Sequence, residues 1–219
     1  KKLNSLNINL EIIETDSFKI FFDKLLKKKD FSIYWNKVYE PNYLKFDEYL
    51  SINLKDKNIT FKRFKGNALN EIDEIKKSDG TPFKVFTPFW RNAEKYYIEK
   101  IPPKEKAIKK CKRKINYFKK CIEPNKILPN KDWYKNFEKI WSPDEISAFK
   151  ELQHFIKDRI ESYSEGRNFP NLTGTSKLSP YIKFGQIHVE TIWSECRKKK
   201  PKTIGTSKFL AEIGWREFN

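Results

Sequence analysis

The 219-residue chain is poor in the residue types that build metal centres and disulfide scaffolds. It contains only three cysteines and two histidines. Cys111, Cys121 and Cys196 form no CxxC pair, so the sequence has no disulfide framework and we expect reduced thiols. His154 and His188 have no partner at metal-ligand spacing, and we therefore expect no metal site.

Long apolar runs are also missing. No stretch approaches the roughly 20 apolar residues of a membrane-spanning helix, and Lys1-Lys2 leads into asparagine-rich sequence instead of an apolar signal core. We expect no membrane association, and a soluble, cytoplasmic, monomeric protein. The chain contains no methionine and so lacks its own start residue, which we interpret as the mark of an internal fragment of a longer protein.

Acidic residues are scarce relative to basic ones. The chain carries 46 Lys and Arg against 29 Asp and Glu, a formal net charge of +17. Such a surplus favours polyanions, because neutralising phosphates releases their counterions, and nucleic acid is the leading partner on charge alone. A generically basic solvated surface explains the same count. With 38% hydrophobic and 16% aromatic residues the chain can fill a core, which excludes global disorder.

The first third of the chain alternates strand-like and helical patterns. Strands are expected at residues 7–12, 31–35 and 59–64, and helices at 18–26, capped by Asp16-Ser17, and at 43–54. Strand, helix, strand, helix, strand is the order of a parallel α/β sheet.

Helical patterns follow. One helix is expected from Thr87-Pro88 to Ile98, and a second after Ser142-Pro143, where Ser142 is the expected N-cap and Glu145 completes a capping box. The apolar positions predicted for this second helix are Ile146, Phe149, Leu152, Ile156, Ile160 and Tyr163. Further helices are expected at 187–198 and from 207 to the end.

The sequence therefore predicts two domains and a linker. Residues 1–99 form an incomplete, Rossmann-like parallel α/β part, and residues 132–219 form the first part of an all-α domain. Residues 100–131 are rich in lysine and proline and are the predicted basic linker.

The segment from Gly174 to Pro180 places several hydroxyls and Lys177 where Ser179-Pro180 opens a helical turn. Free amides at a helix start carry partial positive charge, so this segment is a candidate phosphate site. Spacing alone favours an ordinary capped turn, and the glycines of a Walker loop or dinucleotide fingerprint are absent.

The C-terminal segment is a second candidate. On a helix, Phe209, Glu212 and Arg216 share one face and Trp215 stands beside Glu212, an arrangement that can grip a planar heterocycle. A core helix with an internal ion pair explains the same spacing.

Taken together, five motifs resemble the DNA photolyase/cryptochrome flavoprotein family, most closely its cyclobutane pyrimidine dimer photolyases of class I type. They are Ile33-Tyr34-Trp35-Asn36 with Tyr39-Glu40-Pro41, the stretch from Gly80 to Trp90, Arg167-Asn168-Phe169-Pro170, Gly174-Thr175-Ser176 with Leu178-Ser179-Pro180, and Trp215-Arg216-Glu217-Phe218. They occur in family order along nearly the whole chain.

The resemblance implies an antenna-type α/β domain and a helical domain that binds FAD. The cofactor-binding residues it implies are Tyr163, Thr175, Ser176, Lys177, Leu178, Ser179, Phe209 and Arg216. Phe209 stands where related proteins often have Trp, so an aromatic contact is kept without an indole hydrogen bond. The antenna chromophore of the family is a folate or a deazaflavin, and some relatives use none; the choice stays open.

The resemblance also implies UV-damaged DNA as the partner. Glu212 and Trp215 match the residues that line the dimer pocket, where the Glu contacts the pyrimidine edge and the Trp stacks on the lesion. Arg167 matches a residue near the DNA backbone. In the implied reaction, light excites reduced FAD, which donates an electron to the dimer, and the ring splits. The isolated chain, with part of this pocket, is expected to be inactive.

Three other functions stay open. A cryptochrome is a blue-light photoreceptor that uses the same flavin fold without repair, and a (6-4) photolyase repairs a related lesion. A non-catalytic basic nucleic-acid-binding protein accounts for the charge but not for five ordered motifs.

Overall fold

The computed structural model describes residues 2–28, 31–71, 73–97, 108–114, 118, 121–127, 131–199 and 202–218. The chain forms two compact units. The first, here called the α/β unit, comprises Lys1–Phe64 and Lys104–Lys135. The second, the helical unit, comprises Lys65–Pro103 and Asn136–Asn219.

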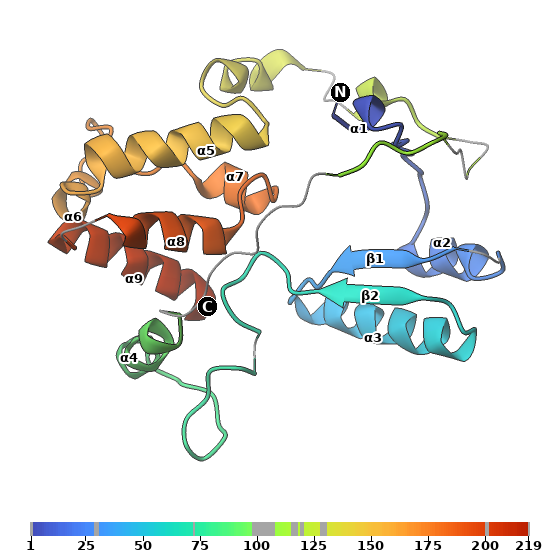
Figure 1. Cartoon of the computed structure of the whole chain (residues 1–219), viewed down its shortest axis with the longest axis horizontal. Coiled ribbons are helices and arrows are strands. Elements are labelled where there is room, and N and C mark those ends of the chain that lie inside the picture. The colour runs from blue at the N-terminus through green and yellow to red at the C-terminus, as the bar shows by residue number, and fades with distance from the viewer. Residues whose placement is uncertain are drawn as a thin grey trace. The chain divides into compact units, whose positions relative to one another are not determined.

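The α/β unit is built around two parallel strands. β1 pairs with β2 so that Ile33 lies opposite Phe61, and helix α3 connects the strands (Figure 1). The elements of this unit are α1 (Lys2–Ser5), α2 (Phe18–Leu25), β1 (Ile33–Asn36), α3 (Pro41–Asp56), β2 (Phe61–Phe64), and the 3-10 helices η1 (Pro124–Ile127) and η2 (Asp132–Tyr134). The predicted parallel α/β part is confirmed.

A half-buried polar contact fastens α3 to both strands. The Asp47 carboxylate accepts a hydrogen bond from Trp35 Nε1 on β1, and its second oxygen lies 2.6 Å from Arg63 Nη1 on β2. Asp47 is only 6% exposed, and a buried carboxylate needs such partners. Beside it, Leu50 and Leu54 of α3 form the buried core of this unit together with Leu26, which follows α2.

The strand expected at residues 7–12 is not formed. Asn7 has a left-handed backbone with φ 58°, and Cys111 N donates to Leu6 O and Ile122 N to Ile12 O at the two ends of the segment. Alternating polarity alone does not keep the backbone in the extended region that a strand requires.

The helical unit contains the remaining elements. They are α4 (Phe86–Tyr97), the 3-10 helix η3 (Phe137–Lys139), α5 (Glu145–His154), the π-helix η4 (Phe155–Arg159), α6 (Tyr163–Gly166), α7 (Ser179–Lys183), α8 (Val189–Lys198) and α9 (Ile204–Phe218). α9 packs against α4, α6 and α8 (Figure 1). Trp193 of α8 is fully buried, and its Nε1 donates to the Tyr97 carbonyl at the end of α4 (3.0 Å).

The domain limits expected at residues 99 and 131 stay predictions. In the structure α4 packs with the helical unit, so the chain passes from the α/β unit to the helical unit between Phe64 and Lys65. The end of the helix expected at Ile98 and much of the expected linker lie outside the described residues.

The cap of the helix expected after Ser142 is corrected. Asp144 is the N-cap, because its side chain accepts a hydrogen bond from Ser147 N (2.8 Å), and the helix begins at Glu145. The local sequence offers two capping residues two positions apart, and Asp144 carries the extended backbone that an N-cap requires.

The apolar stripe of that helix is also rotated from the expected one. Leu152, Ile160 and Tyr163 are buried as expected, but Ile146 and Phe149 are 69% and 43% exposed. Ala148 and Phe155 are fully buried in their place. A π turn, in which Ile160 N donates to Phe155 O, shifts the register behind it and ends the regular α-helix at His154.

Candidate functional site

Helices α6 and α9 bring four of the predicted site residues together. Tyr163 and Phe209 are buried, and their rings meet edge to face with centroids 5.1 Å apart. Phe155 packs on both, with centroids 5.6 and 4.6 Å away. Edge-to-face packing is one of the two favoured aromatic geometries, with offset stacking. Burial raises the pKa of Tyr163, so its phenol stays neutral and contributes aromatic surface.

Arg167 and Glu212 complete this cluster as an ion pair. Arg167 Nη1 faces Glu212 Oε1, and Lys208 Nζ lies 3.4 Å from the same oxygen. The Arg167 guanidinium also lies 5.5 Å from the centroid of the Tyr163 ring. The side chains of Arg167 and Glu212 are 29% and 26% exposed, so the carboxylate is partly screened from water and held between two cations.

The predicted phosphate loop is held to α6 by a close approach of two glycines. A Cβ added to Gly174 would lie 2.8 Å from Gly166 Cα and well inside contact distance of the Gly166 carbonyl. Arg159 Nη1 donates to Thr175 O (3.2 Å), and Trp141 Nε1 donates to Lys177 O (3.4 Å). Three backbone contacts therefore fix the path of this loop.

The exposed side of the loop is polar. Thr175, Lys177 and Ser179 are exposed, whereas Leu178 is buried at 1% exposure. Lys177 has a left-handed backbone with φ 55°, which turns the chain into α7. Two hydroxyls and an ammonium group on a fixed backbone have the chemistry of a phosphate-binding loop, so these residues fit the FAD phosphates that the resemblance implies.

Trp215 projects from α9 onto an aromatic neighbour. Its indole stacks on Phe86 of α4, with centroids 3.8 Å apart and planes 9° apart, and remains 39% exposed. Phe218 meets the same indole edge on at 5.8 Å. An exposed, supported indole is a surface on which a planar ring can stack.

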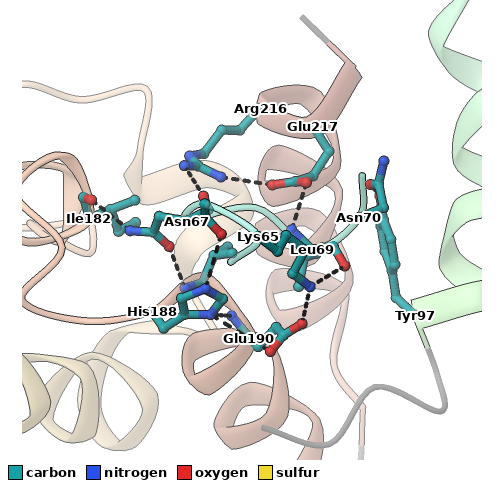
Figure 2. A network of polar contacts seen from close by, with 12 residues as sticks. Lys65, Asn67, Leu69, Asn70, Tyr97, Ile182, His188, Glu190, Arg216 and Glu217 are labelled. Carbon is teal, nitrogen blue, oxygen red and sulfur yellow. Dashed lines mark hydrogen bonds and ion pairs between the residues drawn. The ribbon is translucent and has the colours of Figure 1, made fainter. Parts of the chain in front are cut away.

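Arg216 is engaged by the protein itself. Its Nη1 lies 2.7 Å from Glu217 Oε1, and its Nη2 donates to the carbonyl of Asn67 (Figure 2). Glu217 is nearly fully buried and also accepts a hydrogen bond from Leu69 N (2.7 Å). In the structure the guanidinium therefore ties α9 to residues 65–70, here called the connecting segment; its flavin contact stays a prediction.

The buried Glu217 carboxyl predicts a pH dependence of stability. Burial raises its pKa above the ordinary value of 4.5, against the lowering effects of Leu69 N–H and Arg216. The folded state therefore holds this proton more tightly than the unfolded state. The protonated Glu217 carboxyl therefore contributes its full stabilisation of the folded state below pH 4.5, and this contribution is lost as the pH rises through the raised pKa.

We expect Glu217→Gln to remove this loss, since a Gln oxygen can still accept from Leu69 N. Urea unfolding between pH 4.5 and 7.5 should show the variant gaining free energy of unfolding relative to the parent as the pH rises. Glu138→Gln, at an exposed position, controls for the change in net charge. If the difference in free energy of unfolding between parent and Glu217→Gln stays constant with pH, the raised pKa of Glu217 is not the source of the pH dependence.

Sequence reasoning did not find the connecting segment. Asn67 Nδ2 donates to Ile182 O (2.7 Å) at the end of α7, and its Oδ1 accepts from Val189 N (2.8 Å) at the start of α8. Lys65 pairs with Glu190 of α8, and His188 Nε2 lies 3.3 Å from the Gly66 carbonyl (Figure 2). These contacts join residues about 120 positions apart, so no local pattern signals them.

The described residues form no candidate metal cluster and no membrane-spanning helix, and an open groove lies in the α/β unit. In the parts of the chain that the structure describes, no group of three or more His, Cys, Asp or Glu is placed to hold a metal ion. Among the same residues no helix is long and apolar enough to cross a membrane. An open groove of about 1280 Å³ lies between α2, β1 and the turn before β2, and none of the predicted site residues lines it.

A parallel α/β unit joined to a helical unit with this aromatic and ionic cluster is the architecture of a photolyase-type flavoprotein. The DNA photolyase family model matches residues 1–107. A deoxyribodipyrimidine photo-lyase of Agrobacterium fabrum is 32% identical over 215 residues, covering 95% of this chain and 44% of the relative. The chain belongs to the DNA photolyase/cryptochrome family.

Two further relatives show the breadth of the match. The crystal structure of a bacterial class III photolyase from Agrobacterium tumefaciens superposes with a TM-score of 0.78 at 31% identity, over 99% of this chain and 45% of that one. Cryptochrome-2 of Arabidopsis thaliana is 25% identical over 242 residues, covering 100% of this chain and 38% of the relative. The class I type expected from the motifs is not confirmed.

The chain spans about half the length of the curated relatives it matches. These relatives include both photo-lyases and cryptochromes, so the family supports light-dependent DNA repair or photoreception in general. FAD is the cofactor that the family implies, with damaged DNA as the partner of its photolyases.

Proposed function

We propose that the complete gene product carrying this chain repairs cyclobutane pyrimidine dimers in DNA by light-driven electron transfer from reduced FAD. The observation that carries the proposal is the position of Trp215 on α9. This exposed indole lies one helical turn from Glu212, which is paired with Arg167. The Arg167 guanidinium in turn lies on the ring of Tyr163, which is buried in contact with Phe209. A stacking surface, an oriented carboxylate and buried aromatics are thus carried by two contacting helices.

In this proposal the helical unit supplies part of the flavin site. Thr175, Ser176, Lys177 and Ser179 would hold the phosphates of FAD, and Leu178 closes the loop against the core. Tyr163 and Phe209 would provide apolar surface beside the cofactor, and Arg216 a positive charge. FAD, when bound and reduced, supplies the electron that is transferred after a photon is absorbed. The residues of this chain would bind the cofactor, orient it and shield it from water.

The dimer would be held by charge, stacking and hydrogen bonding. Photolyases extrude their target from the duplex, and a damaged base costs less to extrude than a paired one. In the proposal Trp215 stacks on the extruded lesion, and Glu212, fixed by Arg167, accepts a hydrogen bond from the pyrimidine edge. The chain's net charge of +17 supplies long-range attraction to the phosphate backbone.

Photoreception of the cryptochrome type is the second candidate, supported by the Arabidopsis match over the full length of this chain. It requires bound flavin but no damage recognition. Preference for dimer-containing over undamaged DNA therefore separates the two functions.

The test is Trp215→Ala in the complete gene product. Stacking contributes about 1–3 kcal/mol per base, so the preference for dimer-containing DNA should fall by about 5- to 150-fold while FAD stays bound. Binding is measured by fluorescence anisotropy with matched damaged and undamaged duplexes. Trp133→Ala, which removes a 65% exposed indole from the α/β unit, is the control. Equal discrimination before and after the Trp215 change would refute the role of this residue.

A further inference from the structure

Trp215 has a covered face and an open face. Phe86 lies flat against one side of the indole at 3.8 Å, which is direct ring-to-ring contact. The 39% of Trp215 that remains exposed therefore belongs to its other face and its edges. A ligand that stacks on this residue can reach it from one side only.

Phe86 is itself held by a series of rings that ends in the core. It is the first residue of α4, and it lies nearly parallel to Trp90, one turn along the helix, with planes 11° apart and centroids 6.0 Å apart. Trp90 meets the fully buried Trp193 edge on at 5.9 Å. The plane of Phe86 is thus set from the interior of the helical unit.

Gly214 makes this arrangement possible. A Cβ at position 214 would lie 3.2 Å from Trp90 Cδ2 and well inside contact of two further atoms of that ring. Trp90 therefore rests directly on the backbone of α9, one residue before Trp215. The two helices that carry Phe86 and Trp215 are brought to stacking distance by this contact.

We propose that Phe86 is a positioning residue for Trp215: it fixes the plane of the indole before the ligand arrives. The inference rests on the proposed function, in which Trp215 stacks on the lesion, and it adds that the lesion is met by a preformed surface with one open face. A preorganised ring binds more tightly because the cost of ordering it has been met during folding.

The variants Phe86→Leu and Phe86→Tyr separate positioning from simple packing. Leucine keeps apolar volume but cannot stack, whereas tyrosine keeps the ring. The interaction free energy of one aromatic pair changes an equilibrium constant by about 2- to 10-fold. Phe86→Leu should therefore lower discrimination for dimer-containing DNA by about that factor, and Phe86→Tyr should restore it. Phe184→Leu, at a 78% exposed phenylalanine of the same unit, is the matched control.

A spectroscopic readout tests positioning without DNA. In protein labelled with 5-fluorotryptophan, the fluorine signal of Trp215 is identified by its loss in Trp215→Phe. We expect one sharp Trp215 signal in the parent and in Phe86→Tyr, and a shifted or broadened signal in Phe86→Leu. An unchanged Trp215 signal in Phe86→Leu would overturn the positioning role.

The two proposals fail in different ways. If the Trp215 signal responds to Phe86→Leu but Trp215→Ala leaves damage discrimination intact, Phe86 positions the indole and the proposed function of Trp215 is wrong. If Trp215→Ala abolishes discrimination and Phe86→Leu changes neither readout, the function stands and the positioning role is wrong.

Discussion

Gly174→Ala is expected to destabilise the helical unit and to release the predicted phosphate loop. The added methyl would lie 2.8 Å from Gly166 Cα and closer still to the Gly166 carbonyl. Both are backbone atoms, so no side-chain rotation can relieve the clash. Overpacking costs about 1–3 kcal/mol, and we expect the upper end of that range because α6 or the loop must move. The midpoint of thermal unfolding should fall by roughly 5–10 °C.

The opposite substitution at the same contact is the matched control. A Cβ added to Gly166 would meet only Gly174 Cα within 4 Å, at an ordinary 3.4 Å, so Gly166→Ala should change the unfolding midpoint little. Circular dichroism melts of both variants check stability, and flavin absorbance of the purified gene product checks FAD retention. Equal stability and equal flavin content in the two variants would contradict the account of the loop.

Gly214→Ala is expected to disturb the packing of α4 on α9. Alanine gains up to about 1 kcal/mol over glycine in a helix, but here its methyl would enter the ring of Trp90. Overpacking of about 1–3 kcal/mol exceeds that gain, so the net effect should be a loss of stability. Since Phe86 and Trp215 depend on this contact, damage discrimination should fall with it.

A double-mutant cycle isolates the clash. Trp90→Leu removes the ring atoms that the new methyl would meet, so the double variant should be more stable than the sum of the two single losses predicts. Chemical unfolding of the four proteins gives the coupling energy. Strict additivity would show that the loss in Gly214→Ala has another origin.

Much of the fold could be predicted from local pattern. Ser17 caps α2 as expected, by accepting a hydrogen bond from Ile20 N, and the strand–helix–strand order gave the parallel pair β1 and β2. The failures have tertiary causes. Residues 7–12 alternate like a strand, but Asn7 has a left-handed backbone. Ile146 and Phe149 are exposed because α5 packs on the core through Ala148 and Leu152.

The candidate site was predicted by family resemblance more than by spacing. The resemblance implied roles for Tyr163, Arg167, Phe209 and Glu212, and the structure brings these four together across α6 and α9. Spacing on α9 alone suggested an ion pair internal to the helix, and Glu212 makes one with Lys208. Glu212 also pairs with Arg167, which precedes it by 45 positions and which spacing on α9 could not indicate. The roles assigned to these residues stay predictions.

The contacts of Arg216 and Trp215 could not be inferred from the sequence. Arg216 binds the connecting segment through Asn67, and Trp215 stacks on Phe86, partners that lie more than 120 residues away in the chain. Such pairings depend on how the helices cross, and a single sequence carries no record of that geometry.

The most direct test of the central claim is a comparison of light and dark. The complete gene product, purified with reduced FAD, is mixed with a duplex that contains one cyclobutane pyrimidine dimer and is either illuminated with blue light or kept dark. We predict that intact pyrimidines return only in the illuminated sample and only with the flavin-loaded protein. Flavin-loaded protein that splits no dimers under illumination would contradict repair and favour photoreception.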